Sequence, residues 1–560
     1  MKNTKRFLAM AASLALTACV AMTPVSASAA DITINNISTT ENHTFEVYQI
    51  FTGDLTSGTF TNLRWGSGIS SYDGTSATAG DLVPSDTIDA ITALTGTDSE
   101  KARTIIGKIT PSSTKACEDV VSSGGTASIE GLADGYYLIK DVTNLDGKDD
   151  AKSAWIIQVA GTTEIAIKNS KPTVDKQVHD ETDDAEAGAT DGWGETADHA
   201  INESFQFKLT ATLAQDPDYA SYNTYRVKFN DTLNEGVTYE SIESVKVNGN
   251  NVTAYVAKPD GETDTRTAAQ KAGYIATEPS YSGSTIGGGS LTIEIGDIKQ
   301  FLGESSWADE ASVTVEVIYN AHLNENAAVE KADAEAATTY ENVNKVNLQY
   351  SNNPNVKGSG DTGDTPGENE NEEEFGETPE DYVWVFTYEV DNTKYKVSAV
   401  EGNELEGAGF RLYDSTGTNE IGLIYDAALG AYRPVGTGET PEEMISSDAA
   451  ATKGKFNIVG LDAGDYVLKE TTVPDGYNKA DDFDISIGAT HVENGDGTAA
   501  NLTFDEDNTS NNSIVDTKNN SLPSTGGMGT KLFVLGGGSA AALAGVYLIS
   551  RKRTKKELGE

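Results

Sequence analysis

Cysteine is nearly absent from this chain, which has two cysteines in 560 residues. Cys19 lies in an N-terminal segment with the features of an export leader, so the mature chain would keep Cys117 alone. One cysteine cannot form a disulfide within its own chain. In an exported, strand-rich protein this absence means that any covalent cross-link must come from other chemistry.

Basic side chains are also scarce, with 40 Lys and Arg against 87 Asp and Glu and a formal net charge of −47. Removing residues 1–30 (three basic) and 526–560 (six basic, two acidic) leaves 31 basic and 85 acidic residues, or −54. Such a surface repels nucleic acid and anionic lipid, so we expect no nucleic-acid partner.

Histidine is rare as well, and its five copies show no metal-ligand spacing. The Gly-x-Ser-x-Gly element typical of many hydrolases is missing. We therefore assign no metal ligands, expect no cofactor and no turnover enzyme, and consider a surface hydrolase disfavoured; the sequence does not determine whether a metal ion is bound.

What the chain does contain indicates an all-β fold. Its 14 Pro and 55 Gly accompany many short runs in which Thr, Val and Tyr alternate with other residues. This pattern is typical of short strands and turns in β-sandwich domains, and the length is enough for three or four such domains.

The N-terminus has the three parts of an export signal. Basic residues among the first six precede an apolar run over residues 7–22, and small residues fill positions 27–30. This order predicts a signal peptide over residues 1–30. The Leu-Thr-Ala-Cys sequence that ends at Cys19 is an alternative, lipoprotein-type cleavage site.

The C-terminus has the parts of a membrane anchor. Residues 532–550 are 19 uncharged residues, which as a helix rising about 1.5 Å per residue nearly span a hydrocarbon core of about 30 Å. We expect a single transmembrane helix there in the precursor, with a basic cytoplasmic tail over residues 551–560. A plain tail anchor is the alternative. A pentapeptide precedes the span: Leu522, Pro523, Ser524, Thr525 and Gly526.

This pentapeptide, the Gly-rich spacer, the apolar span and the basic tail together resemble the LPxTG cell-wall sorting signal of Gram-positive surface proteins. In that family a sortase cysteine cuts between the Thr and the Gly, here Thr525 and Gly526, and Thr525 becomes an acyl donor. The resemblance implies a secreted protein that is held briefly in the membrane and then attached to peptidoglycan.

The mature chain divides into three domains and an acidic linker: residues 31–170, 171–357, the linker 358–381, and 382–520. The linker contains Gly, Pro and Thr and has no periodic apolar face. In the first domain we expect short strands, with two short helices over residues 86–95 and 99–109.

Strand alternation places polar side chains on apolar faces in the second and third domains. In the second domain these residues are Lys176, Asp231 and Asn344. In the third domain they are Lys394, Glu470 and Asp516. Unpaired charges are rarely buried, so each set is interpreted either as a buried salt bridge or as an edge where the lysine reaches solvent.

A resemblance offers a further interpretation of these sets. Residues 466–477, YVLKETTVPDGY, resemble the YxLxETxAPxGY E-box of collagen-adhesin B-type (CnaB) domains, with Val473 where Ala is usual. Residues 405–413 resemble that family's L-x-G-A-x-F-x-L-Y strand. In the second domain, residues 231–233 and 350–354 are similar to the corresponding domain of sortase-assembled backbone pilins. The resemblance implies tandem immunoglobulin-like (Cna-type) sandwiches in an elongated array.

In those families such triads form spontaneous isopeptide bonds. The resemblance implies that Lys176 joins Asn344 with loss of ammonia, with Asp231 as the catalyst. It also implies that Lys394 joins Asp516 with loss of water, with Glu470 as the catalyst.

Two features qualify this assignment. The family often has Asn in place of Asp516, and the alternatives Asn511, Asn512 and Asn519 are close in sequence. The first domain has no lysine before Lys101, so its opening strand cannot supply the amine and we expect no such bond there. Because each bond forms once, the protein would not be a turnover enzyme.

Pilins also need an exposed lysine that attacks the threonine of the next subunit, and the family places it at the end of the first domain. Here that position corresponds to Lys168, at the end of a strand expected over residues 155–169 and on its outward face. The family's Tyr-Pro pair before this lysine is absent. Lys171 is the alternative.

The resemblance implies the major subunit of a covalent surface pilus that supports adhesion, with Thr525 joined to Lys168 of the next subunit by a pilin-specific sortase. Its implied partners are identical subunits, accessory tip or basal pilins, a housekeeping sortase and peptidoglycan. The sequence does not identify a host receptor. The alternative is a monomeric, wall-anchored adhesin.

Overall fold

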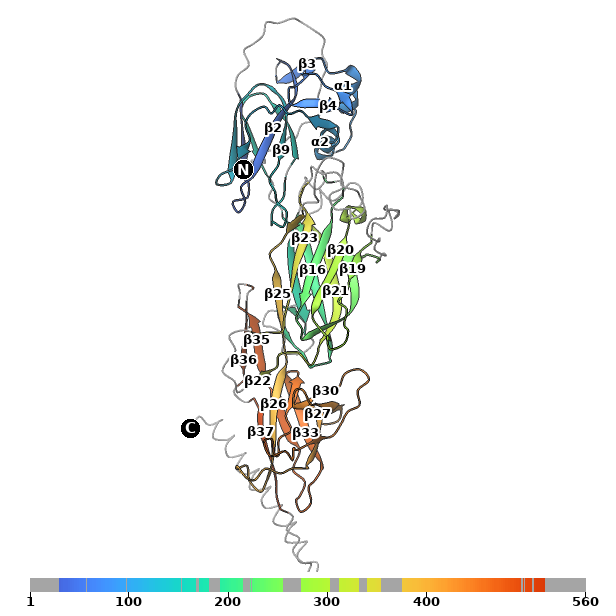
Figure 1. Cartoon of the computed structure of the whole chain (residues 1–560), viewed down its shortest axis with the longest axis vertical. Helices are drawn as coiled ribbons and strands as arrows, with labels where there is room; N and C mark the ends of the chain where they lie inside the picture. The colour runs from blue at the N-terminus through green and yellow to red at the C-terminus, as the bar shows by residue number, and fades with distance from the viewer. Residues whose placement is uncertain are drawn as a thin grey trace, which may run out of the picture.

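In the computed structural model, the chain is all-β and forms an elongated stack of domains, with the N-terminal domain at one end (Figure 1). The structure describes residues 30–518 except for these: 57, 97, 153, 168–170, 181–191, 215–221, 223, 255–272, 303–311, 332–339, 354–374, 495–496, 498 and 506–507. The expected leader, pentapeptide, membrane span and basic tail lie outside the described residues. Within those ranges, no helix is long and apolar enough to cross a membrane.

The first domain packs two sheets around one core and adds a small third sheet. The three-stranded sheet consists of β11 (Thr163–Ala166), β1 (Ala30–Asn35) and β8 (Thr126–Leu132). The facing sheet consists of β10 (Ala154–Val159), β9 (Gly135–Asp141), β2 (Thr44–Thr56), β3 (Thr59–Trp65) and β7 (Val120–Val121). The small sheet consists of β5 (Thr75–Ser76), β4 (Ile69–Tyr72) and β6 (Ile109–Pro111).

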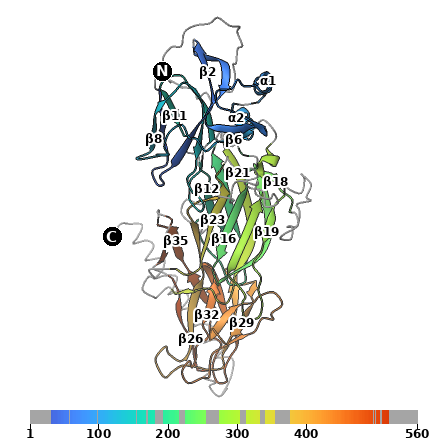
Figure 2. The same ribbon diagram turned by 45° about the horizontal axis from the view of Figure 1, so that its top comes forward.

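The two helices expected in this domain are confirmed as α1 (Ser85–Thr92) and α2 (Asp98–Ile106). They lie on the side opposite β8 and β11 (Figure 2). The single strand expected over residues 155–169 is instead two strands. Gly161, with φ of +100°, allows the turn between β10 and β11, which pair in different sheets.

The second domain is a sandwich of two larger sheets. One sheet consists of β13 (Trp193–Gly194), β12 (Thr173–His179), β15 (Ser204–Ala214), β21 (Ser312–Leu323), β17 (Val237–Val247) and β18 (Asn250–Asn251). The other consists of β14 (Thr196–Asp198), β25 (Asp381–Phe386), β23 (Val343–Ser351), β16 (Val227–Leu233), β20 (Gly289–Ile295), β19 (Ile275–Thr277) and β24 (Phe375–Glu377). A short 3₁₀ helix, η2 (Ile298–Phe301), follows β20.

The third domain is a smaller sandwich. One sheet consists of β22 (Glu330–Lys331), β26 (Tyr388–Lys396), β32 (Ile458–Leu461), β30 (Ala431–Pro434), β29 (Leu423–Asp426) and β37 (Asn511–Asp516). The other consists of β28 (Glu420–Ile421), β27 (Gly409–Asp414), β33 (Gly464–Thr472), β34 (Phe483–Ile487) and β31 (Met444–Ile445). A separate hairpin consists of β35 (Ala489–Glu493) and β36 (Ala500–Phe504).

The second and third domains share a strand at their boundary. β25, expected to open the third domain, pairs with β23 and β14 in the second domain's sheet. The two faces of β25 pack into different hydrophobic cores. Val383 and Val385 lie in the core of the second domain, and Trp384 and Phe386 lie in the core of the third. Apolar side chains on both faces let one strand close two sandwiches, so the chain passes between them at Thr387.

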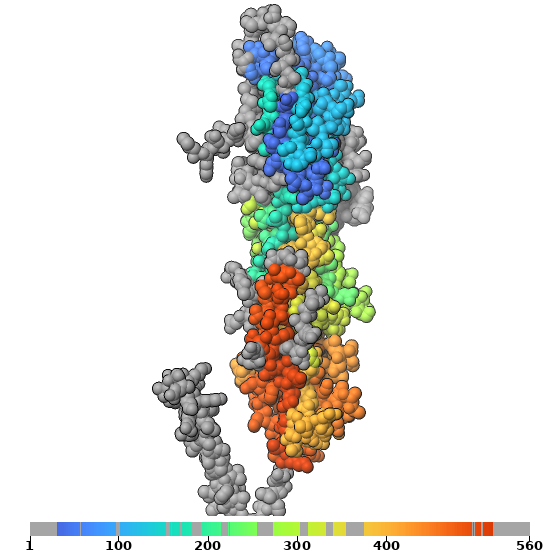
Figure 3. Space-filling view, turned by 90° about the vertical axis from the view of Figure 1, so that its left-hand side faces the viewer, coloured from blue at the N-terminus to red at the C-terminus, as the bar shows by residue number. Residues whose placement is uncertain are grey.

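The hairpin β35–β36 also crosses this boundary. Figure 3 shows the C-terminal strands, in orange-red, running from the third domain along the side of the second. His491 in β35 contacts Thr196 in β14 at 2.8 Å. The two domains are therefore joined by side-chain contacts as well as by the consecutive strands β25 and β26, which Thr387 connects.

Candidate isopeptide-forming sites

In the second domain the structure brings together the three polar residues predicted to share a core face. Lys176 extends from β12 in one sheet, while Asp231 in β16 and Asn344 in β23 extend from the other. All three side chains are completely buried. The alternation that placed them on apolar faces is confirmed, because Val346 and Phe229 on the same faces are also buried.

A fourth residue, Tyr319 in β21, organises this site. Its hydroxyl accepts hydrogen bonds from Asn344 Nδ2 at 2.7 Å and from Lys176 Nζ at 3.2 Å, and it donates one to Asp231 Oδ2 at 3.3 Å. Lys176 Nζ also contacts Asp231 Oδ2 directly. Tyr319 was not predicted from the sequence, although it alternates on its strand with the apolar residues Val315 and Val317, which indicates that it faces the core.

Burial drives the lysine and the acid of this site toward their neutral forms. It lowers the pKa of Lys176 and raises the pKa of Asp231, and their mutual attraction opposes both shifts as a smaller cause. The ring of Phe207, 4.9 Å from Lys176 Nζ, contributes to this apolar environment. Two further atoms, Asp231 Oδ1 and Asn344 Oδ1, are buried without a hydrogen-bond partner.

The third domain has a comparable site. Lys394 in β26 contacts Asp516 in β37, and its Nζ lies 2.9 Å from Oε1 of Glu470 in β33. β26 and β37 are adjacent and parallel, so the domain's first and last strands lie side by side. Glu470 comes from the facing sheet, and its Oε2 accepts a hydrogen bond from the backbone N–H of Ala480 at 2.6 Å.

The geometry favours Asp516 over the nearby asparagines as the partner of Lys394. Asp516 is completely buried, and burial raises the pKa of its carboxyl group, with the charge of Lys394 opposing this shift. Asn512 is also buried, but its Nδ2 donates to Asn392 Oδ1 at 3.1 Å. Asn511 is exposed, and Asn519 lies outside the described residues.

The two candidate polymerising lysines differ in what the structure describes. Lys168 lies outside the described residues, although Ile165 and Ile167 before it are buried as their alternation predicted. Lys171 is described, and its Nζ donates to the backbone oxygen of Asp149 at 2.6 Å and to its Oδ2 at 2.7 Å. Lys171 is therefore held in an ion pair at the boundary between the first two domains.

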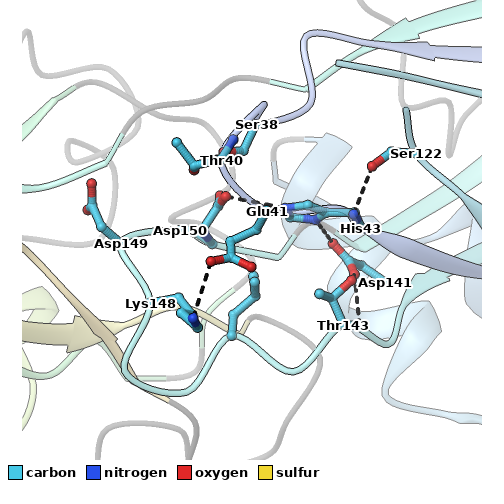
Figure 4. Close-up of polar contacts among 12 residues, drawn as sticks. Ser38, Thr40, Glu41, His43, Ser122, Asp141, Thr143, Lys148, Asp149 and Asp150 are labelled. Atoms are coloured by element: carbon cyan, nitrogen blue, oxygen red, sulfur yellow. Dashed lines mark hydrogen bonds and ion pairs between the residues drawn. The ribbon is translucent and has the colours of Figure 1, made fainter. Parts of the chain in front are cut away.

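That boundary contains another buried polar cluster, which the sequence did not indicate (Figure 4). Nδ1 of His43 lies 2.6 Å from Asp141 Oδ2, and its Nε2 lies 3.3 Å from Asp150 Oδ2. Burial alone lowers the pKa of His43. The hydrogen bonds and charges of the two aspartates outweigh burial and raise this pKa to about 9.

The segment that carries Asp150 packs on the second domain. Gly147 N–H donates to Phe375 O at 2.9 Å, and Lys152 N–H donates to Asn352 O at 2.7 Å. The Asn352 side chain in turn donates to the backbone oxygen of Asp150 at 3.2 Å. His43 therefore stabilises a segment through which the first domain contacts the second.

We expect the first domain to lose stability as the pH rises from 6.5 to 9. A group whose pKa is raised by folding stabilises fully below its unfolded value of about 6.5, and this contribution disappears as the pH passes the folded value. The shift of His43 corresponds to about 3 kcal/mol of unfolding free energy. Thermal unfolding of the first domain at pH 6 and pH 9 measures the loss.

The first domain of the variant His43→Gln should be less stable than that of the wild type at pH 6. Its stability should also change much less between pH 6 and pH 9. His322→Gln is the matched control, because His322 is a partly exposed histidine that pairs with Glu240 in the second domain. An unchanged pH dependence in His43→Gln would show that His43 is not the responsible group.

Comparison with known proteins identifies two parts of the chain. Residues 391–499 match the family model of the SpaA prealbumin-like fold domain, and residues 514–556 match that of the LPXTG cell wall anchor motif. No curated protein matches the chain by sequence. The first match contains Lys394 and Glu470, and Asp516 falls in the second.

Among solved structures, the chain is similar to several major pilins. For the T6 backbone pilin of serotype M6 Streptococcus pyogenes, the TM-score is 0.48 at 19% identity, covering 89% of this chain and 100% of that one. For SpaD from Corynebacterium diphtheriae, the TM-score is 0.40 at 15% identity, covering 88% of this chain and 98% of that one. For SpaA of the same organism, the TM-score is 0.39 at 11% identity, covering 87% of this chain and 100% of that one.

The match to the LPXTG cell wall anchor motif confirms the sorting signal expected at the C-terminus and indicates a cell-surface protein that is anchored to the cell wall. The expected resemblance is confirmed for these two parts of the chain, the domain that contains residues 391–499 and the anchor motif over residues 514–556.

Proposed function

We propose that this protein is the major structural subunit of a covalently polymerised surface pilus, strengthened by one isopeptide bond in each of its last two domains. In this proposal a pilin-specific sortase joins Thr525 of one subunit to Lys168 of the next, and a housekeeping sortase attaches the base to peptidoglycan. The observation that carries the proposal is the pair of buried triads, each with a lysine against a carboxyl or carboxamide group.

In the second domain, the neutral amine of Lys176 attacks Cγ of Asn344. Protonated Asp231 hydrogen-bonds to the carboxamide oxygen and polarises the carbonyl group. A new C–N bond forms, the old C–N bond breaks, and the lysine proton leaves with the amide nitrogen as ammonia. Burial favours the neutral amine and the protonated acid that this reaction requires.

In the third domain, Lys394 attacks Cγ of Asp516 and water leaves. An ionised carboxylate resists attack by an amine, so a raised pKa of Asp516 favours the reactive, protonated form. Glu470, 2.9 Å from Lys394 Nζ, is placed to take the amine proton and return it to the departing hydroxyl group. Folding holds both groups in contact, so the reaction needs no second molecule.

The burial of these groups supports a bond over a simple salt bridge. A salt bridge in the second domain would keep two charges in a fully buried site, where desolvation offsets much of their attraction. It would also leave Asn344 Oδ1 and Asp231 Oδ1 without partners, at about 1–3 kcal/mol each. In the proposed reaction, the proton of Asp231 hydrogen-bonds to the carboxamide oxygen.

Each bond would resist force on its domain. The first would join Lys176 in one sheet to Asn344 in the facing sheet, and the second would join adjacent strands at the two ends of the third domain's chain. Each would close a loop of more than 100 residues. By analogy with a disulfide, the loop entropy stabilises the fold by about 5 kcal/mol per bond.

The ion pair of Lys171 with Asp149 supports the choice of Lys168 as the polymerising nucleophile. Attack on the sortase-bound threonine needs a free, neutral amine. Lys171 would first have to leave both of its hydrogen bonds with Asp149, whereas Lys168 is predicted to lie on the outward face of its strand.

The function is tested by denaturing electrophoresis of material released from the cell wall by a peptidoglycan hydrolase. A pilus gives a ladder of covalent multimers that survives boiling in detergent. A single band at the size of one wall-attached chain would instead support the monomeric adhesin.

A further inference from the structure

A fourth buried cluster lies where the second and third domains meet. Asp180 follows β12 and Asp198 ends β14 in the second domain, while His491 lies in β35, in the hairpin that extends from the third. One oxygen or nitrogen atom from each residue lies within 4.8 Å of the other two. None of the three side chains is appreciably exposed.

Two atoms of this cluster have no hydrogen-bond partner. Nδ1 of His491 is 2.8 Å from Thr196 Oγ1, which leaves Nε2 without a hydrogen bond and 3.4 Å from Asp198 Oδ2. Asp198 Oδ2 accepts from the hydroxyl of Tyr388 at 2.7 Å, while its Oδ1 has no partner. Buried polar atoms are rarely left in this state, and a bound ion is one of the few explanations.

The charge of the cluster points the same way. Asp462 lies beside Asp198 and adds a third carboxyl group next to the cluster. Asp180 and Asp198 place two carboxyl groups beside one imidazole in a buried site. Such a site needs positive charge, either as bound protons or as a metal ion.

We propose that these residues form a divalent metal site of the zinc type, with Asp180, Asp198 and His491 as ligands. A ligand set of one imidazole and two carboxylates suits zinc, whereas calcium and magnesium prefer oxygen ligands throughout. The contact of Nδ1 with Thr196 leaves Nε2 to face the metal, as second-sphere contacts of ligand histidines commonly do.

The metal would join the two domains independently of any isopeptide bond. Two ligands come from the second domain and one from the third domain's hairpin, so binding would fix the hairpin on β14. The proposed isopeptide bonds each lie within one domain and leave this boundary without a covalent cross-link. The metal site does not depend on the pilus function.

The test is titration of metal-free protein, residues 31–521, with Zn²⁺ in a calorimeter, with Mn²⁺ and Ca²⁺ in parallel. The expected result is one Zn²⁺ per chain, bound more tightly than Ca²⁺. His491→Gln should weaken Zn²⁺ binding at least 100-fold, while the control His322→Gln should bind like the wild type. Zn²⁺ should also slow hydrogen exchange in residues 489–504 of the wild type.

Absence of Zn²⁺ binding to the wild-type protein would overturn the proposal. So would equal binding by His491→Gln, or a preference for Ca²⁺, which would point to a site made of oxygen ligands only. Thr196→Ala keeps all three ligands and removes only the contact with Nδ1. Thr196→Ala should bind Zn²⁺ with an affinity between those of the wild type and His491→Gln. If its affinity for Zn²⁺ is no higher than that of His491→Gln, the ligand assignment is contradicted.

Discussion

Replacing Lys168 with alanine is expected to abolish the ladder of covalent multimers while leaving the subunit folded, exported and attached to the wall. The substitution removes the amine that, in the proposed function, attacks the threonine of the next subunit. Attachment to peptidoglycan uses an amine of the wall and should continue. Immunoblots of wall extracts should therefore show one band in place of the ladder.

The matched control is Lys171→Ala. Lys171 lies three residues away and pairs with Asp149, so its removal breaks an ion pair at the domain boundary without removing the proposed nucleophile. The ladder should persist in this variant. A ladder that persists in Lys168→Ala and disappears in Lys171→Ala would reverse the assignment.

Replacing the two proposed catalysts is expected to remove the internal bonds one at a time. Asp231→Asn and Glu470→Gln keep the size of each side chain, but the first loses the acidic proton that polarises the Asn344 carbonyl group and the second cannot take up the amine proton of Lys394. Each should leave its lysine unreacted and lower the stability of its own domain by about 5 kcal/mol, or about 10–20 °C in unfolding temperature. Because the bonds lie in separate domains, the two losses should add in the double variant.

Protease digestion measures the same effect locally. Asp231→Asn should make the second domain sensitive and leave the third resistant, and Glu470→Gln should do the reverse. Glu420→Gln is a suitable control in the third domain, because it changes a partly exposed carboxylate that pairs with Arg411. A domain that keeps its stability after loss of its catalyst would contradict the proposed role of that residue.

The sequence predicted the triads because they depend on strand alternation. Lys176 and Asp231 each occupy a position whose neighbours two residues away are apolar, and Lys394 has the same parity as the apolar face that ends at Val390. Alternation does not say which strands face each other. Lys176 and Asp231 lie on strands of opposite sheets, β12 and β16, and they meet because these two sheets pack face to face.

The sequence could not predict the features at the domain boundaries. The sequence of β25 is compatible with a strand of either domain, because both of its faces are apolar and buried. Only its pairing with β23 assigns it to the second domain. The clusters around His43 and His491 join residues that lie about 100 to 300 positions apart in the chain. Several come from strand ends, where side-chain direction has no regular period.

The most direct test of the isopeptide proposal is the intact mass of protein comprising residues 31–521, produced in cells without a sortase. The proposal predicts a mass lower than that of the sequence by one ammonia and one water. Asp231→Asn should retain the ammonia and Glu470→Gln the water, relative to their own sequence masses. A wild-type protein with its full sequence mass would contradict the proposal and leave both triads as buried salt bridges.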